Sequence, residues 1–435
     1  MNKKILIVFS ILVVLVAGGV VGFLVLNNKS PIISQIVPPA PLPDKSPEFA
    51  NDLINAFNTA TTSIDLPEES VFMVTAYAGD ESEPEDIDFA SDDGSTKQFY
   101  MASTIKPLFA AAYINILEIK DLDYKVPLKF AKGDKTMETI AHNIADKINY
   151  NYDEDVLLDL FILPFFKDYE ETTYEEVYEV LTTKEEIVNF EYTLRDVIKY
   201  TLGPSSNLGL TLLKHDLALK KDITEEVACN LVEEYLNNML IEEGLTGSIV
   251  INKSTKSKVQ KTLNTAKFEE IEYLFDWFYK NQFNLDTEIF NSMKEAMKEV
   301  GTDTVRFNRR HETKSIANKF LAVGEFDIIE KSGYIGFDYE AAPKLNEING
   351  WDTLPPQDGK RIVFFTTSAF ARIYLNTGKF VQYNFSVAVP FYISLDPRYE
   401  ELNGEYTSEK NKILDSLEVN IQEVLEKYRD YIIVK

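Results

Sequence analysis

The sequence predicts an α+β fold, in which an antiparallel sheet made from the two ends of a domain packs against helices and a helical subdomain. Three observations predict it. The chain of 435 residues is 45% apolar, enough to bury a large core. Runs rich in β-branched and aromatic residues lie at 70–77 and between 326 and 392. Between these runs, apolar residues recur at helical spacing. This order favours one antiparallel sheet, with an active site at its seam with the helices.

The N-terminal segment is predicted to anchor the domain. Residues 1–4 precede an apolar run, Ile5–Leu26, whose about 22 residues can cross a ~30 Å hydrocarbon core as one helix. Lys3 and Lys4 lie before this run, so the positive-inside rule predicts a cytoplasmic N-terminus, a single-pass membrane anchor and an extracytoplasmic domain. A cleaved secretory peptide is the alternative, but the small residues that could form its cleavage site fall inside the run. The proline-rich segment 27–47 is predicted to be an extended tether.

The predicted domain spans residues 48–435. Its helices are expected at 48–60, 103–119, 193–200 and 408–431, and its strands at 70–77, 326–330, 361–367, 371–375 and 384–392. Between about 135 and 189 the chain is rich in acidic and aromatic residues at helical spacing, which predicts an acidic helical insertion. This insertion is either a solvated cap or a surface for a substrate or partner.

Charge and composition exclude several functional classes. The formal net charge is −26, so a nucleic-acid partner is not expected. Cys229 is the single cysteine and lies in an amphipathic stretch, which predicts a buried, inert thiol. The histidines His142, His215 and His311 share no motif with a nucleophile or a metal-ligand partner. No cofactor or metal is expected, and the chain is expected to be a monomer.

The first chemical motif is Ser103-Thr104-Ile105-Lys106. A serine three residues before a lysine on a helix places hydroxyl and amine on one face, within reach of proton transfer. Such a pair alone is usually helix surface. Here it is flanked by apolar residues, which predicts that the pair is buried and that the lysine amine has weakened hydration and a lowered pKa, suited to act as a base.

Two further motifs follow in the chain. Ser205-Ser206-Asn207 comes after a Gly-Pro turn, where its side chains can project into a cleft, although Ser205 is alternatively a helix-capping serine. Lys331-Ser332-Gly333 continues a β-like run, and a glycine there lets a substrate backbone approach an edge strand. A strand-to-turn connection is the alternative. The order of the three motifs makes chance an unsatisfactory explanation.

With these motifs in this order, the chain resembles the class A serine β-lactamases and the related penicillin-binding D,D-peptidases. The likeness covers about residues 48–435. It extends to the stretches around the motifs, which are Ala102–Pro107, Tyr192–Asp196, Gly244–Thr246, Asn264–Lys267 and Glu330–Gly336. The resemblance implies a nucleophile, Ser103, a general base, Lys106, and a proton shuttle to the leaving nitrogen, Ser205.

The resemblance also implies a substrate-binding set. Asn207 would bind the substrate amide, and Lys331 with Ser332 would receive the substrate carboxylate. Gly333 would let the substrate lie along the strand, and the backbone N–H of Tyr334 would form the oxyanion hole together with that of the nucleophile. Near this third motif, either of two arginines, Arg361 or Arg372, is a candidate to help hold a carboxylate.

One part of the family pattern is altered. Class A enzymes free the acyl group with a loop glutamate, and Glu233–Asn237 matches that motif but lies inside a helical pattern. The expected interval, 245–268, has several lysines and no acidic residue. We therefore expect acylation by β-lactams or D-Ala-D-Ala wall peptides, followed by slow hydrolysis. A catalytically weak envelope binding or scaffold protein that keeps the fold is the alternative.

Overall fold

The computed structural model describes residues 43–64, 70–80, 98–130, 188–203, 207–251, 264–298, 326–338, 360–394, 415–416 and 419–433. The chain divides into a unit Met1–Pro43 and a unit Asp44–Lys435. The predicted anchor and most of the predicted tether and insertion lie outside the described residues. Within the described part of the chain, no helix is both long and apolar enough to cross a membrane.

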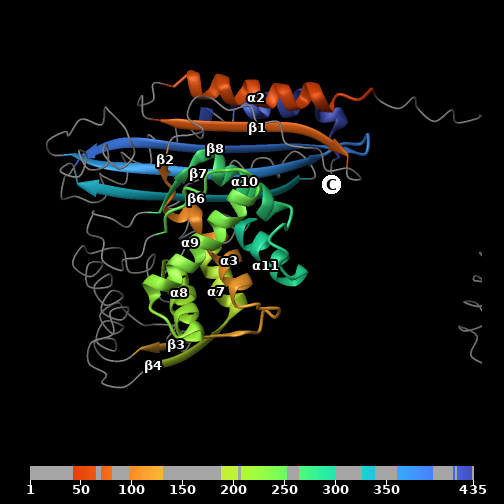
Figure 1. The fold of residues 1–435 in the computed structure, drawn as a ribbon. Coiled ribbons are helices and arrows are strands. Elements are labelled where there is room, and N and C mark those ends of the chain that lie inside the picture. Colours follow the sequence, from red (N-terminus) through yellow and green to blue (C-terminus); the bar gives the residue numbers. More distant parts are fainter. Residues whose placement is uncertain are drawn as a thin grey trace, which may run out of the picture. The chain divides into compact units, whose positions relative to one another are not determined.

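A four-stranded antiparallel sheet joins the two ends of the domain, as predicted. Its order is β1 (Val71–Asp80), β8 (Lys379–Ser394), β7 (Lys360–Tyr374) and β6 (Phe326–Asp338) (Figure 1). All three pairings are antiparallel. The N-terminal strand therefore pairs with the last strand, and β6 lies at an edge of the described sheet.

Helices cover both faces of this sheet (Figure 1). On one face, α2 (Ser46–Thr62) buries Phe49 and Phe57 against Tyr383 of β8, and the helical residues 419–427 join the same apolar cluster. On the other face, Phe275 of α10 stacks on a phenylalanine of β7. Alternate strand residues point to opposite faces, so each face has its own core.

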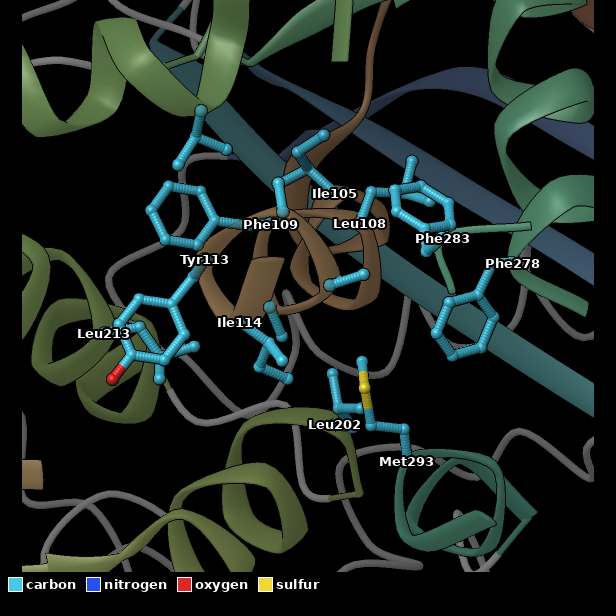
Figure 2. Close-up of a cluster of buried hydrophobic side chains, with 14 of the residues drawn as sticks. Ile105, Leu108, Phe109, Tyr113, Ile114, Leu202, Leu213, Phe278, Phe283 and Met293 are labelled. Carbon is cyan, nitrogen blue, oxygen red and sulfur yellow. The ribbon is translucent and has the colours of Figure 1, made fainter. Parts of the chain in front are cut away.

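The helical part of the domain surrounds α3 (Lys106–Ile116), which is buried on every side. Figure 2 shows its side chains Leu108, Tyr113 and Ile114 reaching neighbours from several other helices. These neighbours belong to α7 (Leu194–Leu202), α8 (Asn207–Lys221), α9 (Glu225–Glu242), α10 (Phe268–Tyr279) and α11 (Thr287–Lys298). A helix that is apolar all round must lie in a core.

Two short strand pairs were not predicted from the sequence. β2 (Gln98–Tyr100) pairs with β5 (Thr265–Lys267), and β3 (Lys125–Phe130) pairs with β4 (Val188–Thr193). β3 ends at Phe130, before the predicted insertion, and β4 begins at Val188, close to its predicted C-terminal limit. Strands this short carry too few alternating positions to be recognised by periodicity.

Three predicted boundaries also differ. The helix expected at 103–119 is a 3₁₀ turn, η1 (Ala102–Ile105), followed by α3, because a proline near the first turn suits a helix start. The strands expected at 361–367 and 371–375 form one strand, β7, since its polar residues are buried instead of marking a turn. The strand expected at 326–330 continues through the Lys-Ser-Gly motif to Asp338.

Candidate active site

The predicted nucleophile and base lie where η1 meets α3. Ser103 is partly exposed in the 3₁₀ turn, whereas Lys106 is the first residue of α3 and is 1% exposed. A 3₁₀ turn has 3.0 residues per turn, so residues i and i+3 lie on the same side. The expectation of a fully buried pair is thus corrected: the amine is buried, and the hydroxyl-bearing residue keeps access to solvent.

The turn that carries Ser103 is fixed to β7. The hydroxyl of Thr366 on β7 donates to the Met101 carbonyl at 3.2 Å and lies 3.0 Å from the Thr104 hydroxyl. A hydroxyl has a single proton, so the Thr104 hydroxyl is the donor in the second bond. The Met101 amide donates to the Asn264 carbonyl at 3.0 Å. The residues on both sides of Ser103 are therefore bonded to other elements.

The same strand positions the third motif. In the β6–β7 register, Gly333 lies opposite Thr366, the residue that binds the Ser103 turn. The pairs on either side are Lys331 with Ser368, Ser332 with Thr367 and Tyr334 with Phe365. Neighbouring strands are about 4.8 Å apart. The backbone of the third motif therefore lies one strand away from the residue that fixes the nucleophile's turn, on an edge strand of the described sheet.

The second motif is only partly described. Ser205 lies outside the described residues, and Asn207 begins α8, so its backbone is helical instead of part of a projecting loop. Leu202 of α7 and Leu212 of α8 both belong to the core around α3. The 203–207 connection thus joins two helices that pack beside the helix of the predicted base.

Replacing Thr366 with valine should weaken both stability and acylation. The change removes the hydroxyl that binds Met101 and Thr104 while keeping the side-chain shape, which should cost about 1–3 kcal/mol of unfolding free energy. Urea unfolding measures the first effect, and the rate of labelling by a fluorescent penicillin measures the second. Thr59→Val on the exposed side of α2 is the matched control. Unchanged stability and labelling in Thr366→Val would show that this hydroxyl does not hold the turn.

The glutamate that matches the deacylation motif has a structural role. Glu233 lies on α9, and its Oε2 accepts the Ile251 amide at 2.9 Å. Asn237, the other end of that match, donates to the Ile249 carbonyl and accepts the Ile249 amide, each at 2.9 Å. These side chains fasten the segment after α9 to the helix. Glu233 thus lies on a helix, as the apolar pattern of this stretch indicated.

Glu270 holds the same segment from α10, and sequence reasoning missed it. Its carboxylate is 1% exposed and accepts the Thr246 hydroxyl at 2.6 Å and the Ser248 amide at 2.8 Å. The Ser248 hydroxyl also donates to it. In the structure it is a glutamate in the first turn of α10, where an acidic residue is common on the surface, so its residue type alone gave no signal. Burial distinguishes it, and the sequence does not encode burial directly.

Neither candidate arginine lies opposite the third motif. The Arg372 guanidinium stacks 4.1 Å from the Phe380 ring centroid and 4.9 Å from that of Tyr279, and it donates to Gln382 at 2.8 Å. Its partner in the register is Asp327, four residues before Lys331, which is roughly 13 Å along the strand. The backbone of Arg361 pairs with that of Asp338, near the far end of β6. The residue directly across from the motif's glycine is a threonine.

Two buried carboxyls on α10 were not predicted. Glu272 and Asp276 are each 1% exposed and face the polar residues of the sheet. Burial raises the pKa of Glu272 from 4.5 to about 8, although a hydrogen bond from Ser386 acts in the opposite direction. Burial also raises the pKa of Asp276, despite its ion pair with Lys280 at 2.8 Å. These groups lie in the layer between α10 and the strands that carry the site.

Histidine, cysteine and metal chemistry find no support among the described residues. His215 is buried and bonded to Glu225 at 3.1 Å, within the helical core. His142 and His311 lie outside the described residues. Cys229 is buried, as predicted, and burial raises the pKa of its thiol. Over the described ranges, no group of three or more His, Cys, Asp or Glu residues could hold a metal ion.

The chain is similar to known proteins in structure, although its sequence matches no protein-family model and no curated protein. Among solved structures, it is similar to a class A β-lactamase from Bacteroides cellulosilyticus, with 13% identity and a TM-score of 0.44 over 85% of this chain and 99% of that one. For TLA-3 extended-spectrum β-lactamase, the identity is 16%, the TM-score 0.47 and the coverage 86% and 99%.

A penicillin-binding protein is also similar. A PBP-A variant, solved as an acyl-enzyme complex with penicillin G, has 12% identity and a TM-score of 0.44 over 89% of this chain and 100% of that one. All three TM-scores lie below 0.5, so these overlaps do not by themselves establish a common fold or a common activity. What the chain does must follow from its own residues.

Proposed function

We propose that this protein is a serine acyl-transfer hydrolase of the β-lactamase and D,D-peptidase type, in which Ser103 forms an acyl-enzyme with a β-lactam or a D-Ala-D-Ala wall peptide. One observation carries the proposal. The turn of Ser103 is hydrogen-bonded through Thr104 to Thr366, which lies directly opposite Gly333 of the third motif. The first and third motifs, more than 200 positions apart in sequence, are thereby connected through one residue of β7, and this connection supports the proposal.

Lys106 is placed to serve as the base in this proposal. It is buried at the first residue of α3, three residues after Ser103. An uncharged amine on the same side of the turn as the Ser103 hydroxyl can accept its proton as the hydroxyl oxygen attacks the acyl carbon. The proton would then pass to the leaving nitrogen, with Ser205 as the proposed shuttle.

The strand geometry suits an extended acyl donor. β6 is an edge strand of the described sheet, and an edge offers backbone groups to which a peptide or its β-lactam mimic can add. We assign Lys331 and Ser332 to the donor's carboxylate and Asn207 to its amide. The backbone N–H groups of Ser103 and Tyr334 would bind the oxyanion, at about 3 kcal/mol per donor.

The test is covalent labelling. Wild-type protein and Ser103→Ala are incubated with penicillin G and examined by intact mass spectrometry, and peptide mapping then locates the added mass. The proposal expects one adduct, on Ser103, in the wild type and none in the variant. Absence of an adduct on folded wild type would favour the alternative of a binding or scaffold protein. An adduct on another residue would refute the assignment of the nucleophile.

We also propose that Ile5–Leu26 anchors the protein in the cell membrane, with the catalytic domain outside the cytoplasm. The support is the apolar length of that run and the lysines before it. A wall-peptide substrate would require this location.

A further inference from the structure

The face of the sheet that packs on α10 is unusually polar. Six of its side chains are at most 2% exposed and carry hydroxyl or amide groups, namely Thr75, Thr366, Ser368, Gln382, Asn384 and Ser386. A sheet face covered by a helix ordinarily buries apolar residues, because each buried polar group must find a hydrogen-bond partner. Polar groups kept in such a place call for a functional explanation.

Hydrogen bonds among these polar groups connect α10 to the residue of β7 that lies opposite the third motif. Ser386 donates to Glu272 Oε1, and the Ser368 hydroxyl lies 2.8 Å from that of Ser386. The single proton of Ser386 is used toward Glu272, so Ser368 is the donor in this state. Ser368 in turn lies opposite Lys331 in the β6–β7 register. Two residues before it on β7, Thr366 binds the turn of the nucleophile.

The surroundings of the Glu272 carboxyl group disfavour its ionised form. Its Oε2 is buried without a hydrogen-bond partner among the described residues, and its side chain is 1% exposed. Asp276 on the same helix and Tyr383 on β8 interact with it electrostatically, and Lys280 and Arg372 act on Asp276 in turn. The nearest acidic neighbour therefore also opposes a negative charge on Glu272.

We propose that Glu272 is a positioning residue which holds the Ser386–Ser368 hydroxyl pair beneath the strand position opposite Lys331, and whose ionisation weakens the binding of an anionic acyl donor. This inference rests on the proposed function. Glu272 accepts the Ser386 hydroxyl in either protonation state, so ionisation adds a charge without breaking that hydrogen bond. On ionisation the carboxyl gives one proton to solvent and leaves a negative charge in a medium of low dielectric. That charge opposes a donor carboxylate bound at the third motif.

The experiment compares pH profiles. Acylation of full-length wild type, Glu272→Gln and Ser386→Ala by a fluorescent penicillin is followed from pH 6 to 9.5, and each profile is separated into a binding constant and a rate constant. Wild type should lose binding by about tenfold above the pKa of Glu272, near 8, whereas Glu272→Gln should keep its binding constant there. Glu269→Gln, a more exposed glutamate on the same helix, should retain the wild-type profile.

A stability measurement gives a second readout. The pKa of Glu272 is higher in the folded protein than its ordinary value of 4.5, so the folded state keeps a proton that the unfolded chain releases. The stability that this proton provides is complete below pH 4.5 and is lost as the pH rises to about 8. The midpoint of thermal unfolding should fall across this window in wild type and less in Glu272→Gln.

The outcomes separate the two proposals. A labelled wild type with the same alkaline loss of binding in Glu272→Gln overturns the role of Glu272 and leaves the proposed function intact. Should Glu272→Gln fail to fold, Ser386→Ala decides, because loss of the hydroxyl that donates to Glu272 should raise the pKa of this carboxyl further and move the loss of binding to higher pH. A wild type that forms no adduct at any pH overturns both proposals.

Discussion

Replacing Lys106 with methionine should slow acylation of Ser103 by about 10³-fold while leaving the protein folded. A positioned general base contributes typically 10²–10⁴-fold, and methionine fills similar space without an amine. Because Lys106 is 1% exposed, the unfolding free energy of the variant measures what this buried side chain contributes to stability, separately from its effect on the labelling rate. The measurement is the labelling rate with a fluorescent penicillin, together with urea unfolding of the same sample.

Lys125→Met is the matched control, since Lys125 is exposed at the start of β3 and should label at the wild-type rate. A folded Lys106→Met that labels as fast as wild type would remove Lys106 from the mechanism. It would then require another group to accept the Ser103 proton. A loss of stability together with slow labelling would instead indicate that the buried Lys106 side chain holds the turn in place.

Much of the fold was predictable because its elements are long and regular. The apolar residues Phe49, Leu53 and Phe57 recur at helical spacing, so α2 was predicted within a few residues of its ends. The sheet followed from the order of elements, since a strand near each end and helices between them leave few ways to pair. The short pairs β2–β5 and β3–β4 were missed because three to six residues hold little periodic signal.

The sequence motifs of the candidate site could be recognised, but the contacts that bring these motifs together could be predicted only in part. The Ser-x-x-Lys spacing is local, so it was visible in the sequence, but the bond between Thr104 and Thr366 joins residues 262 apart. The position of Thr366 opposite Gly333 depends in addition on the register of β6 and β7, which side-chain alternation could not fix here because β7 buries polar residues. The burial of Glu272 could not be predicted from the sequence either, because a glutamate on an amphipathic helix is ordinarily solvent-exposed.

The acyl-enzyme should be long-lived, and Glu233 should have no part in its hydrolysis. In wild type, the adduct with penicillin G should persist for minutes or longer, because Glu233 is bonded to the Ile251 amide at the stem of the segment after α9. A deacylating base would otherwise accelerate hydrolysis by about 10²–10⁴-fold. The lifetime is followed by intact mass spectrometry after the free drug is removed.

The variant Glu233→Gln tests whether Glu233 takes part in hydrolysis of the acyl-enzyme. Glutamine keeps a carbonyl oxygen that can accept the Ile251 amide but cannot act as a base, so the fold should be retained and the adduct lifetime should stay within about twofold of wild type. Glu234→Gln, one residue along α9 and exposed, is the matched control. A lifetime that lengthens by about 100-fold in Glu233→Gln alone would make Glu233 the deacylating base. The protein would then be a hydrolysing β-lactamase whose catalytic glutamate lies on a helix, and slow turnover would need another cause.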